Sequence, residues 1–144
     1  MTRAGSVALT LEGVDAVVLP DEGGVLTHLR VGGRAVLAST PWEHDLPRWD
    51  APAQSESEWV ARWRGGWQLC FPSAGMVDSL SRWPQAFHGV ASQARWHVVA
   101  VGEHDVSVGW EDEFGLAALR TWTLTSNGVR VQTIATNGSA VTRP

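Results

Sequence analysis

The stretch RGGWQLCFPSAG, residues 64–75, decides how the rest of the chain is organised. It combines a glycine pair, aromatic rings and a proline without a strand or helix period, and Phe87-His88-Gly89 follows shortly after it. A segment rich in Gly, Pro and aromatic residues between regular strands is typical of a loop that builds a site. We therefore expect residues 64–89 to hold the functional groups and the flanking residues to form a β scaffold.

The residues before this loop have the alternation and the turn residues of a β meander. Tight turns are expected at Glu12-Gly13, at residues 20–24 and at Gly32-Gly33, because Gly and Asp tolerate the backbone angles that such turns need. The strands between these turns are expected at Ser6–Leu11, Ala16–Leu19, Val25–Val31 and Ala35–Ala38.

A short helix is expected between this meander and the loop. Prolines interrupt the strand pattern after Ser39, which indicates a surface excursion. Residues 55–64 then offer an N-cap at Ser55 or Ser57 and place Trp59 and Trp63 on one helix face. Because a helix this short is stable only when packed, we expect the two indole rings to dock it beside the loop.

Stronger strand patterns follow the loop. Ser126-Asn127-Gly128 is a good hairpin turn, because Asn and Gly tolerate positive φ angles. Several short strands at close spacing, with no linker and no repeat, predict a single domain over residues 1–144 with an all-β, antiparallel β-sandwich fold. The strands are expected at Arg95–Val101, Asp105–Trp110, Leu116–Thr125 and Val129–Thr136, with a weaker one at Met76–Leu80.

Charge and hydropathy exclude several classes of partner. The chain has 144 residues and a net charge of −4, and all 11 of its basic residues are Arg. An acidic balance argues against nucleic acid and anionic membranes as main partners. No apolar run has membrane-spanning length, and the N-terminus lacks an apolar signal core. We therefore expect a soluble, cytoplasmic protein.

The Cys, His and Trp residues narrow the chemistry further. The single Cys70 excludes an internal disulfide and a multi-cysteine zinc site, and its position between Leu69 and Phe71 predicts a buried, inert thiol. His44 lies between two acidic residues, but three consecutive side chains do not converge on one ion, so a solvated loop and no metal are expected. Most of the nine Trp residues are expected in the core, although their flat faces also suit sugar rings.

Four sequence motifs follow one another along the chain and are best compared together. They are GGVLTHLRVGGR at residues 23–34, GGWQLCFPSAG at 65–75, FHG at 87–89 with Trp96 downstream, and LRTWTLT at 119–125 leading to Asn137. Together they resemble the aldose 1-epimerases (galactose mutarotases and their relatives). The resemblance implies a galactose mutarotase-like supersandwich of antiparallel strands, and about half of it, since family members are about twice as long and only their N-terminal half is matched.

The resemblance also implies a reaction and a set of site residues. Mutarotation opens a hemiacetal ring and recloses it on the other face, so one group removes the anomeric hydroxyl proton and another protonates the ring oxygen. The family's earlier histidine, which holds and polarises the sugar, has its counterpart in His88. Its glutamate base and its second histidine would fall beyond Pro144. The residues expected to line the sugar side are Arg64, Trp67, Phe71 and Ser73.

Three hypotheses follow for the function. The first is an aldose 1-epimerase-like protein that interconverts sugar anomers, either incomplete or completed by a second chain that supplies the missing half. The second is a non-catalytic carbohydrate-binding or regulatory module on the same scaffold. The third is a degenerate fragment whose open sandwich exposes strand edges and apolar surface. None of them needs a cofactor, and the first two predict an aldose sugar or sugar derivative as the ligand.

Overall fold

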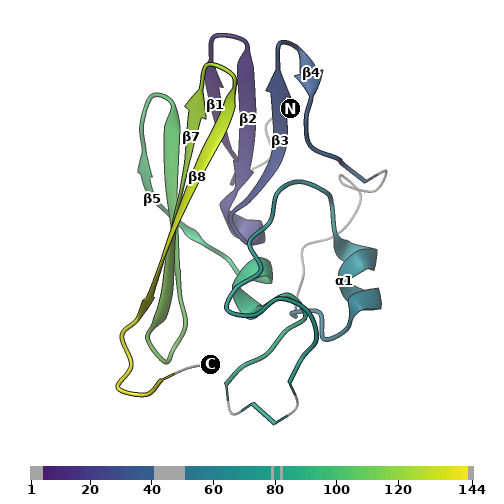
Figure 1. The fold of residues 1–144 in the computed structure, drawn as a ribbon, viewed down its shortest axis with the longest axis vertical. Coiled ribbons are helices and arrows are strands. Elements are labelled where there is room, and N and C mark those ends of the chain that lie inside the picture. The colour runs from purple at the N-terminus through teal and green to yellow at the C-terminus, as the bar shows by residue number, and fades with distance from the viewer. Residues whose placement is uncertain (1–4, 41–50, 79, 82, 143–144) are drawn as a thin grey trace.

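Two four-stranded antiparallel sheets, packed face to face, make up most of the molecule (Figure 1). The computed structural model describes residues 5–40, 51–78, 80, 81 and 83–142. Each sheet is a meander whose strands pair in sequence order. The first contains β1 (Val7–Leu11), β2 (Val14–Leu19), β3 (Val25–Val31) and β4 (Arg34–Ala35), and the second contains β5 (His97–Val101), β6 (Asp105–Glu111), β7 (Leu116–Thr125) and β8 (Gly128–Asn137). The expected all-β antiparallel sandwich is therefore confirmed.

Two of the predicted strands are wrong. In place of the strand expected at Ala35–Ala38 there is only the two-residue β4, because the chain then leaves β3 and Ser39 pairs with Gly65 of the loop instead. The described residues of Met76–Leu80 form no strand. There the Asp78 carboxylate accepts a hydrogen bond from the Leu80 N–H at 2.9 Å, which closes a turn.

The predicted helix and its cap are confirmed. The helix α1 spans Glu56–Arg62, and the Ser55 hydroxyl oxygen accepts a hydrogen bond from the Glu58 N–H at 3.3 Å, which makes Ser55 the N-cap. Two single-turn 3₁₀ helices, η1 (Pro20–Glu22) and η2 (Val90–Gln93), lie near the start of β3 and before β5. None of these described helices has the length and apolar character needed to cross a membrane. His44 lies outside the described residues.

The core lies between the two sheets. The even-numbered residues of β7 are buried and the odd-numbered ones are partly exposed, as period-2 alternation requires when one face of a strand points inward. On this inner face Trp122 joins a buried cluster that includes Val106 and Val108 of β6 and Val14 and Val18 of β2. Burying one such aliphatic side chain contributes about 1.5–3 kcal/mol, so this cluster is the main source of stability for the scaffold.

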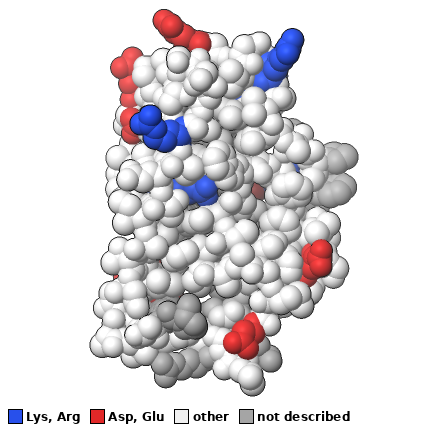
Figure 2. Space-filling model, viewed as in Figure 1, with Lys and Arg blue, Asp and Glu red and all other residues white. Residues whose placement is uncertain are grey.

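The edge strands of the second sheet are open to solvent. Strand β8 lies at one edge, next to β7, and most of its side chains are exposed on both faces. Strand β5 lies at the other edge, and all its side chains are exposed. Charged side chains are sparse on the face drawn in Figure 2, and most of those visible lie toward its upper end. The loop region and α1 lie beside the sheets rather than between them (Figure 1).

Candidate functional site

Residues 64–67 attach to the edge of β3, where the loop begins. The Trp67 N–H donates to the Leu26 carbonyl oxygen at 2.8 Å, and the Leu26 N–H donates back to the Trp67 carbonyl oxygen at 3.2 Å. Gly66 has a φ of 86°, and a Cβ placed there would lie 2.5 Å from the Leu26 carbonyl oxygen. Only glycine permits this approach, so the glycine pair fixes the position from which the loop departs.

Residues 67–71 then run over aromatic side chains of the second sheet. The Trp67 ring meets the buried Trp122 ring edge-on, with centroids 5.5 Å apart, and the Phe71 ring meets Trp110 in the same way at 6.1 Å. Trp122 is itself held by its indole N–H, which donates to the Gly24 carbonyl oxygen at 3.2 Å. Trp67 remains 42% exposed, so this segment covers the end of the core while leaving part of one indole accessible.

His88 is held rigidly against the far end of the loop. Its backbone N–H donates to the Gly75 carbonyl oxygen at 3.1 Å, and its ring Nδ1 accepts from the Gly75 N–H at 3.0 Å. Because Nδ1 is an acceptor, the neutral imidazole carries its proton on Nε2. The ring also lies edge-on to Trp59 of α1, at 4.8 Å between centroids. This confirms that Trp59 docks the helix beside the loop, and it leaves Nε2 as a hydrogen-bond donor.

The backbone around His88 is tied to Phe71. The Ala91 N–H donates to the Phe71 carbonyl oxygen at 3.0 Å. Gly89, at φ 83°, lies so close that a Cβ there would be 2.2 Å from the same oxygen. The Gln93 side chain donates to the Phe87 carbonyl oxygen at 2.7 Å. The Phe87-His88-Gly89 motif therefore acts as a clamp on the middle of the loop.

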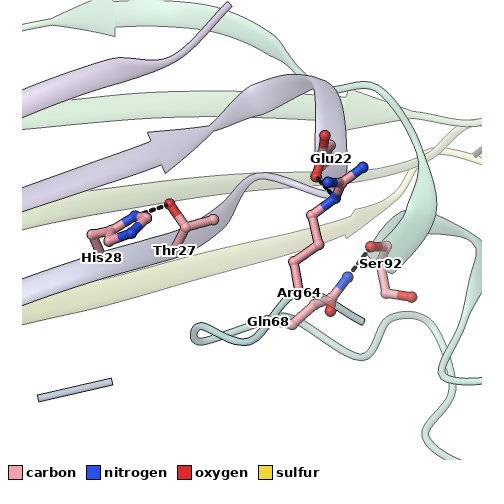
Figure 3. A network of polar contacts seen from close by, with 6 residues as sticks. All are labelled: Glu22, Thr27, His28, Arg64, Gln68 and Ser92. Atoms are coloured by element: carbon pink, nitrogen blue, oxygen red, sulfur yellow. Dashed lines mark hydrogen bonds and ion pairs between the residues drawn. The ribbon is translucent and has the colours of Figure 1, made fainter. Parts of the chain in front are cut away.

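Arg64 lies in a separate polar network. Its Nε forms an ion pair with a Glu22 carboxylate oxygen at 3.0 Å, and the two side chains are only 6% and 19% exposed. In Figure 3 the Arg64 side chain reaches toward Glu22, and the neighbouring Gln68 amide donates to the Ser92 carbonyl oxygen. A small pocket lies beside this network, lined also by Asp21, Val25, Arg62, Trp63, Gly65 and Gln93. The charge of Arg64 is thus already balanced by a protein carboxylate.

The predicted site residues do not form one cluster in this structure. His88 and Phe71 belong to the same hydrogen-bonded clamp, whereas Trp67 lies at the start of the loop and Arg64 pairs with Glu22. Ser73 is half-buried between Phe71 and Gly75. Their expected roles toward a sugar stay predictions. Within the described residues, no three His, Cys, Asp or Glu side chains come together as metal ligands would.

Sequence reasoning missed Arg120, which lies on the inner face of β7. Its side chain is 3% exposed, and its guanidinium carbon lies 4.1 Å from the centre of the Trp122 ring. Burial lowers the pKa of Arg120 to about 10, and the nearby Cys70 opposes this only partly. The signal was present in the sequence, because Leu116, Arg120 and Leu124 share the inner face of the alternating β7 pattern.

The prediction of a buried Cys70 is wrong. Its side chain is exposed, because the loop segment that carries it runs over the core rather than within it. The pKa of the thiol is nevertheless raised: loss of hydration around the sulfur outweighs the attraction of the Arg120 cation. The raised pKa keeps the thiol protonated near neutral pH, which disfavours a nucleophilic role.

Solved structures share this fold. Slr1438 protein from Synechocystis sp. PCC 6803 matches with a TM-score of 0.70 at 16% identity, over 92% of this chain and 48% of that one. A galactose mutarotase related enzyme from Lactobacillus acidophilus matches with a TM-score of 0.66 at 14% identity, over 93% and 44%. A protein from Escherichia coli K12 assigned as an aldose 1-epimerase matches with a TM-score of 0.57 at 14% identity, over 94% and 48%.

The similarity to these structures is a similarity of fold, and it extends over about half of each of them. The chain spans about half the length of the solved structures it matches. No family model matches its sequence, and no curated protein sequence matches it. The chain therefore has the β-sandwich fold of about half of a galactose mutarotase-related protein, as the motifs implied.

Proposed function

We propose that the chain is an aldose-binding, epimerase-like protein in which His88 donates a hydrogen bond to a sugar oxygen. Interconversion of the anomers then requires a carboxylate base from a second polypeptide segment. The observation that carries the proposal is the anchoring of the His88 ring by Gly75 and Trp59, on a scaffold that shares its fold with a galactose mutarotase related enzyme.

The chemistry of His88 supports a polarising role. An imidazole whose Nδ1 accepts from a backbone N–H presents Nε2–H as a donor in a fixed direction, and a donor stabilises negative charge that develops on a sugar oxygen when the ring opens. Because the ring is held on two sides, little side-chain entropy is lost when a ligand binds. Trp67 offers a partly exposed indole face of the kind that suits the apolar C–H face of a pyranose, but it lies outside the His88 clamp, so the proposal rests on His88.

Proton removal from the anomeric hydroxyl needs a second group. The described contacts of His88 are with backbone atoms of Gly75 and with the rings of Trp59 and Phe87, and none of them is with a carboxylate. A donor without a base can bind and polarise a sugar but cannot complete a mutarotation. This favours the non-catalytic binding module as the second candidate for the chain acting alone.

Two measurements test the proposal. Tryptophan fluorescence of the purified chain, titrated with a panel of aldoses, is expected to change saturably for at least one sugar. His88→Ala should weaken that binding about 3- to 10-fold, which corresponds to one lost hydrogen bond. His97→Ala, at an exposed histidine of β5, is the matched control and should bind as the wild type does. No response to any aldose, or equal weakening in both variants, would contradict the binding role.

Polarimetry separates the two candidate functions. The chain alone should not accelerate the anomerisation of glucose or galactose beyond the buffer rate. Acceleration on addition of the product of the adjacent gene, lost with His88→Ala, would support the epimerase. Sugar binding without any acceleration of anomerisation after that addition would support the binding module. Acceleration by the chain alone would show that the base lies within these 144 residues.

A further inference from the structure

Arg120 is a buried cation, and two of its three guanidinium nitrogens lack a hydrogen-bond acceptor among the described residues. Its side chain is 3% exposed, and its Nε and Nη1 atoms are buried without a hydrogen-bond partner. Buried polar groups in native proteins are almost always hydrogen-bonded, and a buried charge is costly unless it is paired. Two unpartnered nitrogens of a buried guanidinium therefore indicate an acceptor that the described part of the chain does not supply.

The surroundings of Arg120 fix the position of its charge. The guanidinium carbon lies 4.1 Å from the centre of the Trp122 ring, whose attraction for a cation offsets only part of the burial cost. Trp67 and Phe71, on either side of Cys70 in the loop, contact Trp122 and Trp110. The exposed Cys70 interacts electrostatically with Arg120, so this loop residue lies near the buried charge.

The neighbouring strand places exposed residues beside this charge. Thr133 of the edge strand β8 is paired directly with Arg120, and directly paired residues of antiparallel strands project from the same face. Thr133 and Ala135, two residues further along that face, are both exposed. The inner face of β8 is therefore open to solvent at Thr133 and Ala135, beside the buried arginine, and Thr133 carries a hydroxyl donor.

We propose that Arg120 anchors an oxyanion-binding site between residues 67–71 and the inner face of β8, which takes a carboxylate or phosphate group of a small ligand. A guanidinium presents a planar fork of N–H donors that matches the two oxygens of such a group. The Thr133 hydroxyl adds a further donor on the same side. The site is distinct from Arg64, whose charge Glu22 already balances, and it does not depend on the sugar-binding role of His88.

The test measures binding of simple oxyanions by the whole chain. Thermal unfolding and tryptophan fluorescence are followed against inorganic phosphate and, in a second arm, acetate, at constant ionic strength set with sodium chloride. The wild type is expected to gain stability and to change fluorescence saturably with at least one of the two. Response to phosphate alone assigns a phosphate ligand, and response to acetate alone assigns a carboxylate. No response to either overturns the proposal.

Substitutions locate the site. Arg120→Met should weaken the binding about 10- to 100-fold, the range expected for a lost charge-assisted hydrogen bond. Arg130→Gln, at an exposed arginine of β8 paired with the outward-facing Thr123, removes the same charge elsewhere and should keep the response. An unchanged response in Arg120→Met, or equal weakening in both variants, places the anion elsewhere and overturns the proposal.

A second variant, Thr133→Glu, tests for the anion site without removing Arg120. Thr133→Glu puts a carboxylate on the face it shares with Arg120, with the two Cβ atoms about 4.5–5.5 Å apart. This internal anion should raise the melting temperature and abolish the response to phosphate or acetate. Thr133→Gln has the same size without the charge and should still respond. If Thr133→Glu responds as Thr133→Gln does, no anion site exists at Arg120.

Discussion

Replacement of Arg120 by Met should stabilise the isolated chain, although most core substitutions destabilise. The pKa of Arg120 is lowered to about 10 because burial disfavours its charged form. A lowering of this size corresponds to ~3 kcal/mol of unfavourable free energy for the cation in the native state. Met fills a similar length without charge but loses the contact with Trp122, which is worth about 0.5–2 kcal/mol. The net expectation is a gain of about 1–3 kcal/mol in the free energy of unfolding.

The stabilisation should depend on pH in a direction that the pKa fixes. Because the pKa is lowered on folding, the unfolded chain holds the Arg120 proton more tightly than the native chain does. The free energy of unfolding of the wild type therefore rises with pH between about pH 10 and pH 12, and the cost of the charge is fully present below pH 10. The advantage of Arg120→Met should be constant from pH 7 to 9 and shrink above pH 10.

The composition makes this alkaline experiment unusually clean. The chain contains no Tyr and its basic residues are all Arg, so no lysine or tyrosine side chain titrates in the same range. Cys70 does, and with the opposite sign: its raised pKa makes the native state bind the proton longer, so stability falls as the pH rises above about 9. Both chains should therefore carry Cys70→Ser.

The assay is urea unfolding followed by tryptophan fluorescence at pH 8 and pH 11.5 in a buffer without phosphate or carboxylate. Two-state behaviour must be verified with a second probe before free energies are compared. A loss of stability in Arg120→Met at pH 8 would refute the argument, because it would mean that the cation is already paired. A difference between the two chains that does not change between the two pH values would refute the assigned cause.

The remaining predictions concern the loop, its ion pair and the helix cap, and all are read from urea unfolding. Gly89→Ala should cost about 2–4 kcal/mol, because its Cβ would lie 2.2 Å from the Phe71 carbonyl oxygen, whereas Gly13→Ala, at φ 79° in open space, should cost only about 1–2 kcal/mol; equal losses would argue against the clamp. Arg64→Met should cost about 3–5 kcal/mol because it breaks the buried ion pair with Glu22, and Glu22→Gln in the same chain should recover part of that loss; additive losses would speak against the pair. Ser55→Ala should cost about 1 kcal/mol and Ser57→Ala clearly less; the reverse order would reassign the cap.

The strands could be predicted from sequence because their signal is local. The alternation in Val25–Val31 and in Leu116–Thr125 gives the bounds of β3 and β7 as the structure has them. The length of strand β4 was overestimated because it depends on a pairing with a residue distant in sequence. Gly65 pairs with Ser39, and the sequence of residues 35–38 does not predict that contact. Local pattern therefore predicts where a strand can form, but long-range pairing decides how far it extends.

The loop was located correctly, but its internal geometry was not predictable. Its glycines and proline indicate irregular backbone, yet they do not say that Gly75 will bond both the backbone and the ring of His88. The Arg64–Glu22 pair joins residues far apart in sequence, and neither residue type indicates the other. Arg120 was predictable in principle, because register alone places it inward, but a polar residue in a strand is normally assigned to the outward face.

Arg64 and Arg120 are both buried, but opposite changes in stability are expected when each is replaced by Met. Arg64 has a carboxylate at 3.0 Å, so its removal breaks a buried ion pair and should destabilise the fold. Arg120 has no described acceptor for two of its nitrogens, so its removal should relieve a charge and stabilise the fold. A natural sequence keeps such a cost where function requires it. The sign of the stability change at Arg120, compared with that at Arg64, therefore separates a binding group from a structural one before any ligand is known.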